Sequence, residues 1–270
     1  VAGAEALEKL EVKDGYTIEI TCQLYNGDLL TAYTGKLLKE KAVDTLPYPK
    51  MEKLDVREES GAQRIEAKPV HKNRIVFYGH SAFTRWTDRW GHREMEDDLI
   101  GRDGNTTVLN HGFGTSSADD LLYYYHRMVR PYAPRALVLS TMSNDIGFGY
   151  SAKEVMEIQA RIIQWAKADF PGIRVYCFNY EPTLKHKGQD NIATRVGAEY
   201  NQLLEAFCAV TEDCIYVPME KQAFFFEDPA DIGDYHKVRE DIFAADQVHL
   251  NPKGYAMFMD FVRELLDDLL

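Results

Sequence analysis

From Arg74 onward, short apolar runs alternate with segments whose apolar residues recur every three or four positions. Five of the runs are rich in β-branched residues, as is typical of strands buried on both faces: Ile75–Tyr78, Thr107–Asn110, Ala136–Ser140, Ile173–Asn179 and Ile215–Pro218. Helical patterns lie between or after them, beginning near Ser116–Ser117, at Ser151, near Ile192 and at Asn251-Pro252. This alternation predicts an α/β fold with a parallel sheet and helices on both of its faces.

The first 70 residues follow a different pattern. Thr17–Cys22 alternates like a strand, and Leu29–Leu46 reads as partly helical up to the break at Pro47. The segment is short and polar for an independent domain. We therefore expect residues 1–70 to form an extension packed on a main domain of residues 71–270.

Charge and cysteine usage narrow the class of protein. The net charge of −12, from 31 basic and 43 acidic residues, argues against a nucleic-acid or anionic-membrane surface. No apolar run approaches the ~20 residues of a membrane span, and the first residues show no signal-peptide pattern. The four cysteines are scattered and predict buried free thiols in a reducing compartment. We expect a cytoplasmic protein, with export left open because the sequence does not begin with Met.

Residues that suit acyl transfer follow the predicted strands. Ser81 comes after the first strand and Gly79, Gly114 after the second strand, and Asn144 after the third. The carboxyl ends of parallel strands meet at one edge of a sheet, where ligands bind. Near the C-terminus, Asp246 and His249 supply an acid and a base. A nucleophile, an acid, a base and two potential oxyanion donors therefore converge.

Each of these residues also has an ordinary structural interpretation. A serine after a strand is usually a helix cap, an isolated Asp-x-x-His is usually a cap beside an exposed histidine, and an Asn-Asp pair is usually a turn. A metal site is the weaker alternative, because the nearby acids and histidines lack a ligand spacing such as H-E-x-x-H: His236, Asp241, Asp246 and His249. No Walker or dinucleotide glycine pattern follows a strand, so we expect no cofactor.

Four short blocks in this order resemble those of the SGNH hydrolases, also called the GDSL esterase/lipase family. They are GHS at Gly79–Ser81, NHGFGT at Asn110–Thr115, Asn144-Asp145, and Asp246-x-x-His249 followed by LNPKGY. The resemblance implies a flavodoxin-like three-layer α/β/α sandwich with a five-stranded sheet, and ester hydrolysis. It also implies that Ser81 is the nucleophile, His249 the general base and Asp246 the residue that orients His249. The implied oxyanion hole consists of the backbone N–H groups of Ser81 and Gly114 and the side-chain amide of Asn144.

Two positions depart from the family pattern. His80 replaces the usual Asp before the serine, and Met142 replaces the usual Gly two residues before the Asn. We expect His80 and Met142 to contact the substrate, although His80 is also read as an ordinary loop histidine. Trp86 and the aromatic run Phe224–Phe226 are further candidates for the wall of a sugar or acyl pocket.

The sequence thus predicts a cofactor-independent serine esterase acting through an acyl-enzyme. Small soluble substrates are favoured, such as acetylated carbohydrates or short-chain esters, because no lipid-binding apolar segment is visible. A lysophospholipase or thioesterase is the alternative within the class. A catalytically silent member that binds carbohydrate or a protein partner is the alternative outside it.

Overall fold

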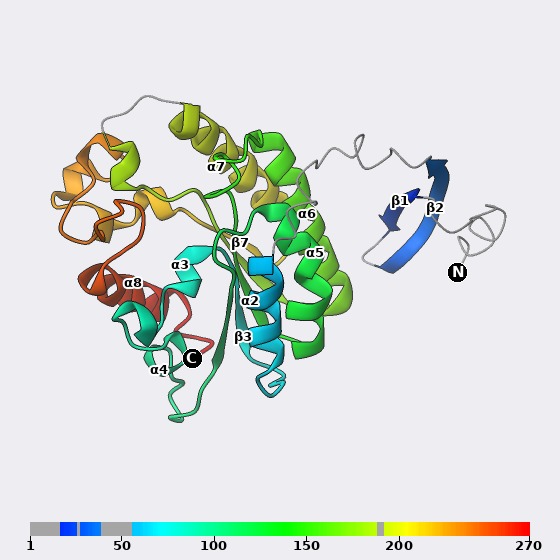
Figure 1. Cartoon of the computed structure of the whole chain (residues 1–270), viewed down its shortest axis with the longest axis horizontal. Coiled ribbons are helices and arrows are strands. Elements are labelled where there is room, and N and C mark those ends of the chain that lie inside the picture. Colours follow the sequence, from blue (N-terminus) through cyan, green and yellow to red (C-terminus); the bar gives the residue numbers. More distant parts are fainter. Residues whose placement is uncertain (1–16, 26–27, 39–55, 188–191) are drawn as a thin grey trace.

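The computed structural model describes residues 17–25, 28–38, 56–187 and 192–270, and a five-stranded parallel sheet lies at its centre (Figure 1). The strands are β3 (Ile75–Gly79), β4 (Val108–Gly112), β5 (Ala136–Ser140), β6 (Arg174–Phe178) and β7 (Cys214–Val217). Their order across the sheet is β4-β3-β5-β6-β7, and every neighbouring pair is parallel. The five predicted strands are confirmed, with bounds shifted by at most two residues.

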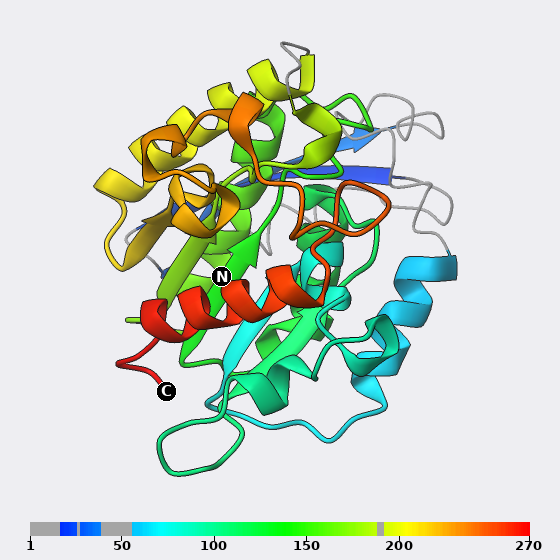
Figure 2. The ribbon, with the colours of Figure 1, turned by 90° about the vertical axis from the view of Figure 1, so that its left-hand side faces the viewer.

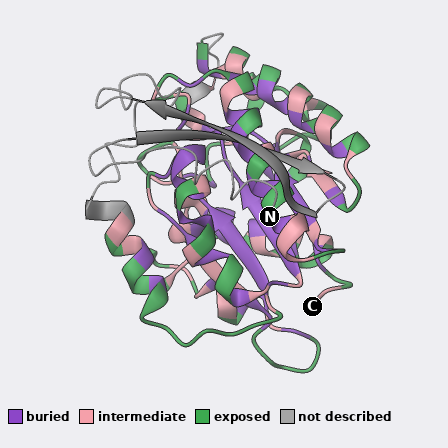
Figure 3. Cartoon of the chain, turned by 90° about the vertical axis from the view of Figure 1, so that its right-hand side faces the viewer, coloured by how far each residue is buried: buried purple, intermediate pink, exposed green. Residues whose placement is uncertain are grey.

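Helices cover both faces of this sheet, so the predicted three-layer sandwich is confirmed. Successive side chains of a strand point to opposite faces: on β3, Val76 and Tyr78 belong to one core cluster, and Ile75 and Phe77 to the other. The first cluster is covered by α5 (Ala118–Met128), α6 (Ala152–Asp169) and α7 (Ile192–Val210). The second is covered by α3 (Ser81–Thr84), α4 (Met95–Asp98) and α8 (Pro252–Leu265). Figure 2 shows α8 in red in front of the sheet, and Figure 3 shows the buried strands behind the partly exposed helices of the other face.

The helix starts predicted at Ser151 and Asn251 are confirmed by their caps. Ser151 accepts the backbone N–H of Glu154 at 3.3 Å, and Glu154 accepts the backbone N–H of Ser151 at 2.8 Å, which is a capping box. Asn251 accepts the N–H of Gly254 at 3.1 Å and begins α8 just after His249. The cap therefore fixes where the loop that carries His249 ends.

The strand register brings the candidate residues to one edge of the sheet. Gly79 at the end of β3 pairs with Gly112 of β4 and with Ser140 of β5. The three central loops therefore leave the sheet side by side at its carboxyl edge. These are the loops that contain Ser81, Gly114 and Asn144.

The N-terminal region differs in part from its prediction. The strand at Thr17–Cys22 is confirmed within β1 (Thr17–Tyr25), which pairs antiparallel with β2 (Asp28–Leu38) in a separate two-stranded sheet. The helix predicted for Leu29–Leu46 is therefore wrong for residues 29–38, because the run TAYTG favours a strand; residues 39–46 lie outside the described part.

A helix of the same region packs on the main domain. This is α2 (Val56–Glu66), which contacts α5 through the buried residues Ala62 and Ile65. Arg127 of α5 binds Glu59 and Glu66, with shortest distances of 2.8 and 2.7 Å. The division of the chain at residue 70 stays a prediction.

Candidate active site

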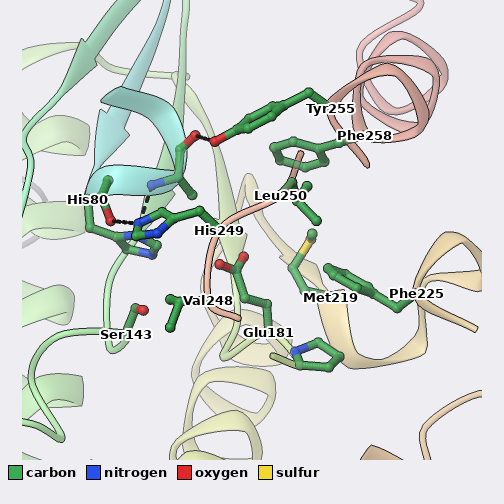
Figure 4. A pocket seen from close by; sticks show the side chains of 13 residues that line it. His80, Ser143, Glu181, Met219, Phe225, Val248, His249, Leu250, Tyr255 and Phe258 are labelled. Carbon is green, nitrogen blue, oxygen red and sulfur yellow. Dashed lines mark hydrogen bonds between the residues drawn. The ribbon is translucent and has the colours of Figure 1, made fainter. Parts of the chain in front are cut away.

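Ser81 opens α3 directly beyond the carboxyl end of β3. Gly79 ends the strand, and a Cβ atom there would lie only 2.7 Å from the Ser140 carbonyl oxygen and 2.9 Å from the ring of Phe83. Only glycine lets the chain turn this close to β5. The turn presents the partly exposed side chain of Ser81 to a pocket at this edge of the sheet (Figure 4).

Three predicted side chains form a continuous chain of hydrogen bonds. Ser81 Oγ lies 2.7 Å from Nε2 of His249, and Nδ1 of His249 lies 2.8 Å from Oδ2 of Asp246. Oδ1 of Asp246 accepts the backbone N–H groups of Val248 and His249 at 3.1 and 3.0 Å. Because the carboxylate only accepts hydrogen bonds, the proton of the neutral imidazole is on Nδ1, and Nε2 accepts from the serine hydroxyl.

Arg85, which the sequence analysis did not single out, lies beside this chain of bonds. Its Nη1 is 2.6 Å from Oδ2 of Asp246, and its guanidinium lies 4.3 Å from the centroid of the Trp90 ring. Burial alone would raise the pKa of Asp246, but hydrogen bonds from the His249 and Val248 backbone, the His249 ring and Arg85 hold that pKa well below its usual range.

The same surroundings lower the pKa of His249. Burial contributes most to this lowering; the Asp246 hydrogen bond opposes it, while the positive charge of Arg85 adds to it. The imidazole is therefore neutral, and able to accept a proton, down to a pH below that of an ordinary histidine.

The predicted oxyanion donors lie on the three neighbouring loops but are not equally available. The backbone N–H groups of Ser81 and Gly114 donate to no residue in the described part of the chain. The side-chain amide of Asn144 donates to the backbone carbonyl of Ser116 at 2.9 Å, which uses one of its two hydrogens. Neither Gly114 nor Asn144 lines the pocket beside Ser81, whereas Ser143 does.

Comparison with known proteins identifies the family. The sequence model of the GDSL-like lipase/acylhydrolase family matches residues 75–257, which contain the parallel sheet and every residue named above for this site. The chain belongs to the GDSL-like lipase/acylhydrolase family. Among curated proteins, none matches its sequence.

Solved structures support the fold of this family member. A GDSL-like lipase from Bacteroides thetaiotaomicron superimposes with a TM-score of 0.60 at 16% identity, over 79% of this chain and 98% of that one. A member of the lipolytic G-D-S-L family from Veillonella parvula gives 0.54 at 21% identity, over 73% and 99% of the two chains. An acetyl xylan esterase gives 0.53 at 18% identity, over 72% and 99%.

His80 has a structural role in this family member. It is only 4% exposed, Nδ1 accepts the backbone N–H of Ala82 at 3.3 Å, and Nε2 lies 3.1 Å from Ser140 Oγ. Since Nδ1 accepts, the proton is on Nε2 and is donated to Ser140. Burial, and then the charge of His249, lower the pKa of His80 to about 4. The ring borders the pocket with both nitrogens occupied, so a contact between His80 and the substrate stays a prediction.

The two other predicted substrate contacts are wrong. Trp86 is fully buried in the core, and its indole N–H donates to Asp98 at 2.8 Å. Met142 is also fully buried, with a φ of 79°, and neither residue lines the pocket. That positive φ is the physical reason for the glycine that the family pattern has at position 142. Asp145 serves this loop by accepting the N–H groups of Ala118 and Met142 at 2.7 and 3.1 Å.

Apolar side chains form most of the pocket beside Ser81, which is open to solvent and has an empty volume of about 440 Å³ when the solvent at its mouth is included. Besides the residues already named, its walls are Pro182, Met219, Phe225, Leu250, Tyr255 and Phe258. Of the predicted run Phe224–Phe226, only Phe225 lines this pocket. One charged residue that the sequence analysis missed, Glu181, lies among these walls (Figure 4), and burial raises its pKa to about 7.

The described part of the chain brings one group of potential metal ligands together, and it is not the acid–histidine set considered from sequence. Cys214 Sγ lies 3.6 Å from Cys177 Sγ and 3.3 Å from Cys208 Sγ. All three thiols are free and buried in the core, as predicted, and none lines the Ser81 pocket. Within the described residues, no helix is long and apolar enough to span a membrane.

Proposed function

We propose that this protein is a serine esterase that hydrolyses short-chain carboxylic esters through an acyl-enzyme. The observation that carries the proposal is the chain of hydrogen bonds from Ser81 through His249 to Asp246, at 2.7 and 2.8 Å. A serine hydroxyl is a poor nucleophile until a base takes its proton, and a histidine with a bonded Nδ1 is placed to do so. Family membership supports the same class of reaction.

In the acylation step, Ser81 Oγ attacks the ester carbonyl carbon while its proton passes to Nε2 of His249. Asp246 keeps the imidazole oriented and stabilises the imidazolium that forms. Collapse of the tetrahedral intermediate breaks the bond to the alcohol oxygen, which takes the proton from Nε2. Water then attacks the acyl-enzyme in the same way, with His249 accepting the proton of the water and returning it to Ser81 Oγ.

The negative charge of the tetrahedral intermediate needs hydrogen-bond donors. The backbone N–H groups of Ser81 and Gly114 are without described partners, and Asn144 retains a second amide hydrogen beside its bond to Ser116. We assign these three donors to the oxyanion. In this assignment, the Asn144 amide donates one hydrogen to the Ser116 carbonyl, which fixes its orientation, and donates the other hydrogen to the oxyanion.

The shape of the pocket supports small substrates. Phe225, Phe258 and Met219 are almost fully buried where they form the wall, so little space opens behind Ser81 without moving core side chains. Short acyl groups such as acetyl fit this arrangement better than long chains. The acetyl xylan esterase among the similar structures is consistent with an acetylated carbohydrate as substrate.

Hydrolysis of p-nitrophenyl acetate, butyrate and decanoate tests this proposal. We expect the acetate to react fastest, and Ser81→Ala to abolish turnover. Ser143→Ala is the matched control, since it removes a hydroxyl from the same pocket without touching the chain of bonds. A preference for decanoate would favour a lysophospholipase or thioesterase. No hydrolysis of any of the esters would favour a silent binding member.

A further inference from the structure

Glu181 is a carboxylate of the pocket that the proposed reaction does not use. It follows β6 and lines the pocket together with Ser81 and His249. Figure 4 shows its carboxyl group between His249 and Met219, directed into the space that the substrate would enter. Its oxygens accept no hydrogen bond and join no ion pair within the described part of the chain. The pocket thus contains a half-buried acid that has no partner among the described residues.

Within the described residues, the surroundings of Glu181 supply no compensating charge. None of the described residues that line the pocket is a lysine or arginine, and the other titratable groups among them are His80, His249 and Tyr255. His80 donates to Ser140, His249 is hydrogen-bonded to Asp246, and the Tyr255 hydroxyl donates to the Ala82 carbonyl at 2.7 Å. Tyr180, the neighbour of Glu181 in the chain, is buried, and burial raises the pKa of its hydroxyl well above neutrality.

An ionised carboxylate without a partner in apolar surroundings raises the free energy of the protein. A ligand that pairs with this carboxylate removes that cost and therefore binds more tightly. Opposite charges attract more strongly in apolar surroundings than in water, so the ionised carboxylate favours a cation over a neutral sugar hydroxyl, whether or not the cation carries an N–H. The aromatic rings of Phe225, Tyr255 and Phe258 add to this preference, because aromatic faces attract ammonium groups. The net charge of −12 also draws cations to the surface.

We propose that Glu181 determines specificity by binding an ammonium group of the ester substrate. The inference rests on the proposed esterase function and adds the chemical class of the substrate: small esters that carry a positively charged nitrogen. Glu181 takes no part in bond making or breaking. Its effect is confined to the choice between charged and neutral esters.

Two esters of nearly equal shape test this specificity, namely acetylcholine and its neutral carbon analogue 3,3-dimethylbutyl acetate. At pH 8.5, where Glu181 is ionised, we expect kcat/KM of the wild-type protein to be about tenfold or more higher for acetylcholine. Glu181→Gln should bring the two values together while leaving the neutral ester within about threefold of wild type. Glu212→Gln is the matched control, because it removes the same charge from an exposed loop before β7 and should keep the preference.

The pH dependence of this ratio gives a second readout. The pKa of Glu181 is about 7, so the preference for acetylcholine should grow between pH 6 and pH 8 as the carboxyl group loses its proton. Ionisation of His249 alters the rates for both esters equally and cancels in the ratio. A ratio that is flat with pH, or unchanged in Glu181→Gln, overturns the proposal even though the protein hydrolyses both esters.

Binding of choline separates this inference from the esterase function. Calorimetry needs no turnover, and we expect choline to bind the wild type and Glu212→Gln but not Glu181→Gln, with 3,3-dimethylbutanol as the neutral control. Choline binding without hydrolysis would support the cation site and refute the esterase. Hydrolysis of neutral esters without choline binding would overturn the cation site and leave the esterase standing.

Discussion

On one side of Ser81, His249, Asp246 and Arg85 form an unbroken series of hydrogen bonds and ion pairs, whereas on the other side the amide of Asn144 is bonded to a backbone carbonyl. The first side, the proposed base side, has its hydrogen bonds in place with no substrate bound. On the proposed oxyanion side, two backbone N–H groups donate to no described residue, and the Asn144 amide uses one of its two hydrogens for Ser116.

The contrast follows from how the chain builds each side. Asp246 and His249 lie three residues apart, and the carboxylate also binds the backbone of its own loop, so local structure fixes their geometry. The oxyanion side depends on loops after three different strands, and its geometry is set by tertiary packing. Local bonds therefore hold Asp246 against His249, whereas the proposed oxyanion donors are held together by tertiary packing alone.

The largest effects should come from breaking the base side. We expect His249→Gln to lower kcat on the order of 10⁶-fold, because His249 is the one described side chain that is hydrogen-bonded to Ser81 Oγ. Asp246→Asn should cost about 10⁴-fold, because an amide favours the wrong tautomer of His249. Steady-state kinetics with p-nitrophenyl acetate measures both. His236→Gln, at an exposed histidine, is the control and should be silent.

On the oxyanion side, Asn144→Ala should lower kcat by about 10²–10³-fold and change KM little. The amide meets full negative charge only near the transition state, so its loss removes transition-state rather than ground-state binding. Steady-state kinetics that determines kcat and KM separately distinguishes a loss of transition-state binding from a loss of ground-state binding. An increase in KM at constant kcat would make Asn144 a substrate-positioning residue and end its assignment to the oxyanion hole.

Arg85 should have a smaller effect that appears in the pH profile. Its charge lowers the pKa of His249, so Arg85→Gln should raise that pKa and move the acidic limb of kcat/KM to higher pH. The maximal rate should fall only a few-fold, since the Asp246–His249 bond remains. Arg89→Gln, at an exposed residue of the same segment, is the control. If the acidic limb of kcat/KM lay at the wild-type pH in both variants, Arg85 would not lower the pKa of His249.

The smallest catalytic effect is expected at His80. His80→Ala removes the cap on Ala82 and the bond to Ser140, which should lower the free energy of unfolding by about 1–2 kcal/mol. His80→Asp keeps a side-chain acceptor for the cap and should lose less. Denaturant unfolding gives the stabilities, and kcat should stay within about twofold of wild type for both. A collapse of kcat in the stably folded Asp variant would show that His80 takes part in the reaction.

The sequence predicted the sheet and most helices because strand burial and helix caps leave local signals, as at Ala136–Ser140 and Ser151. The prediction is wrong at β2, where the spacing of apolar residues also fits a helix, while the run TAYTG after Asn-Gly favours a strand. Trp86 and Met142 were misplaced because their burial is set by distant elements. Arg85 lies 161 residues from Asp246, so no short sequence motif links the two residues. Glu181 follows its strand without another candidate residue beside it, so the sequence gives no sign that it lines the pocket.

The central claim is that Ser81 carries the acyl group, and the most direct test is to trap that intermediate. After rapid acid quenching of a reaction with p-nitrophenyl acetate, peptide mass spectrometry should find an acetyl group on Ser81. The adduct should be absent from Ser81→Ala and present in Ser143→Ala. Steady turnover of the ester with no acetyl group on Ser81, or with the acetyl group on another residue, would contradict the account.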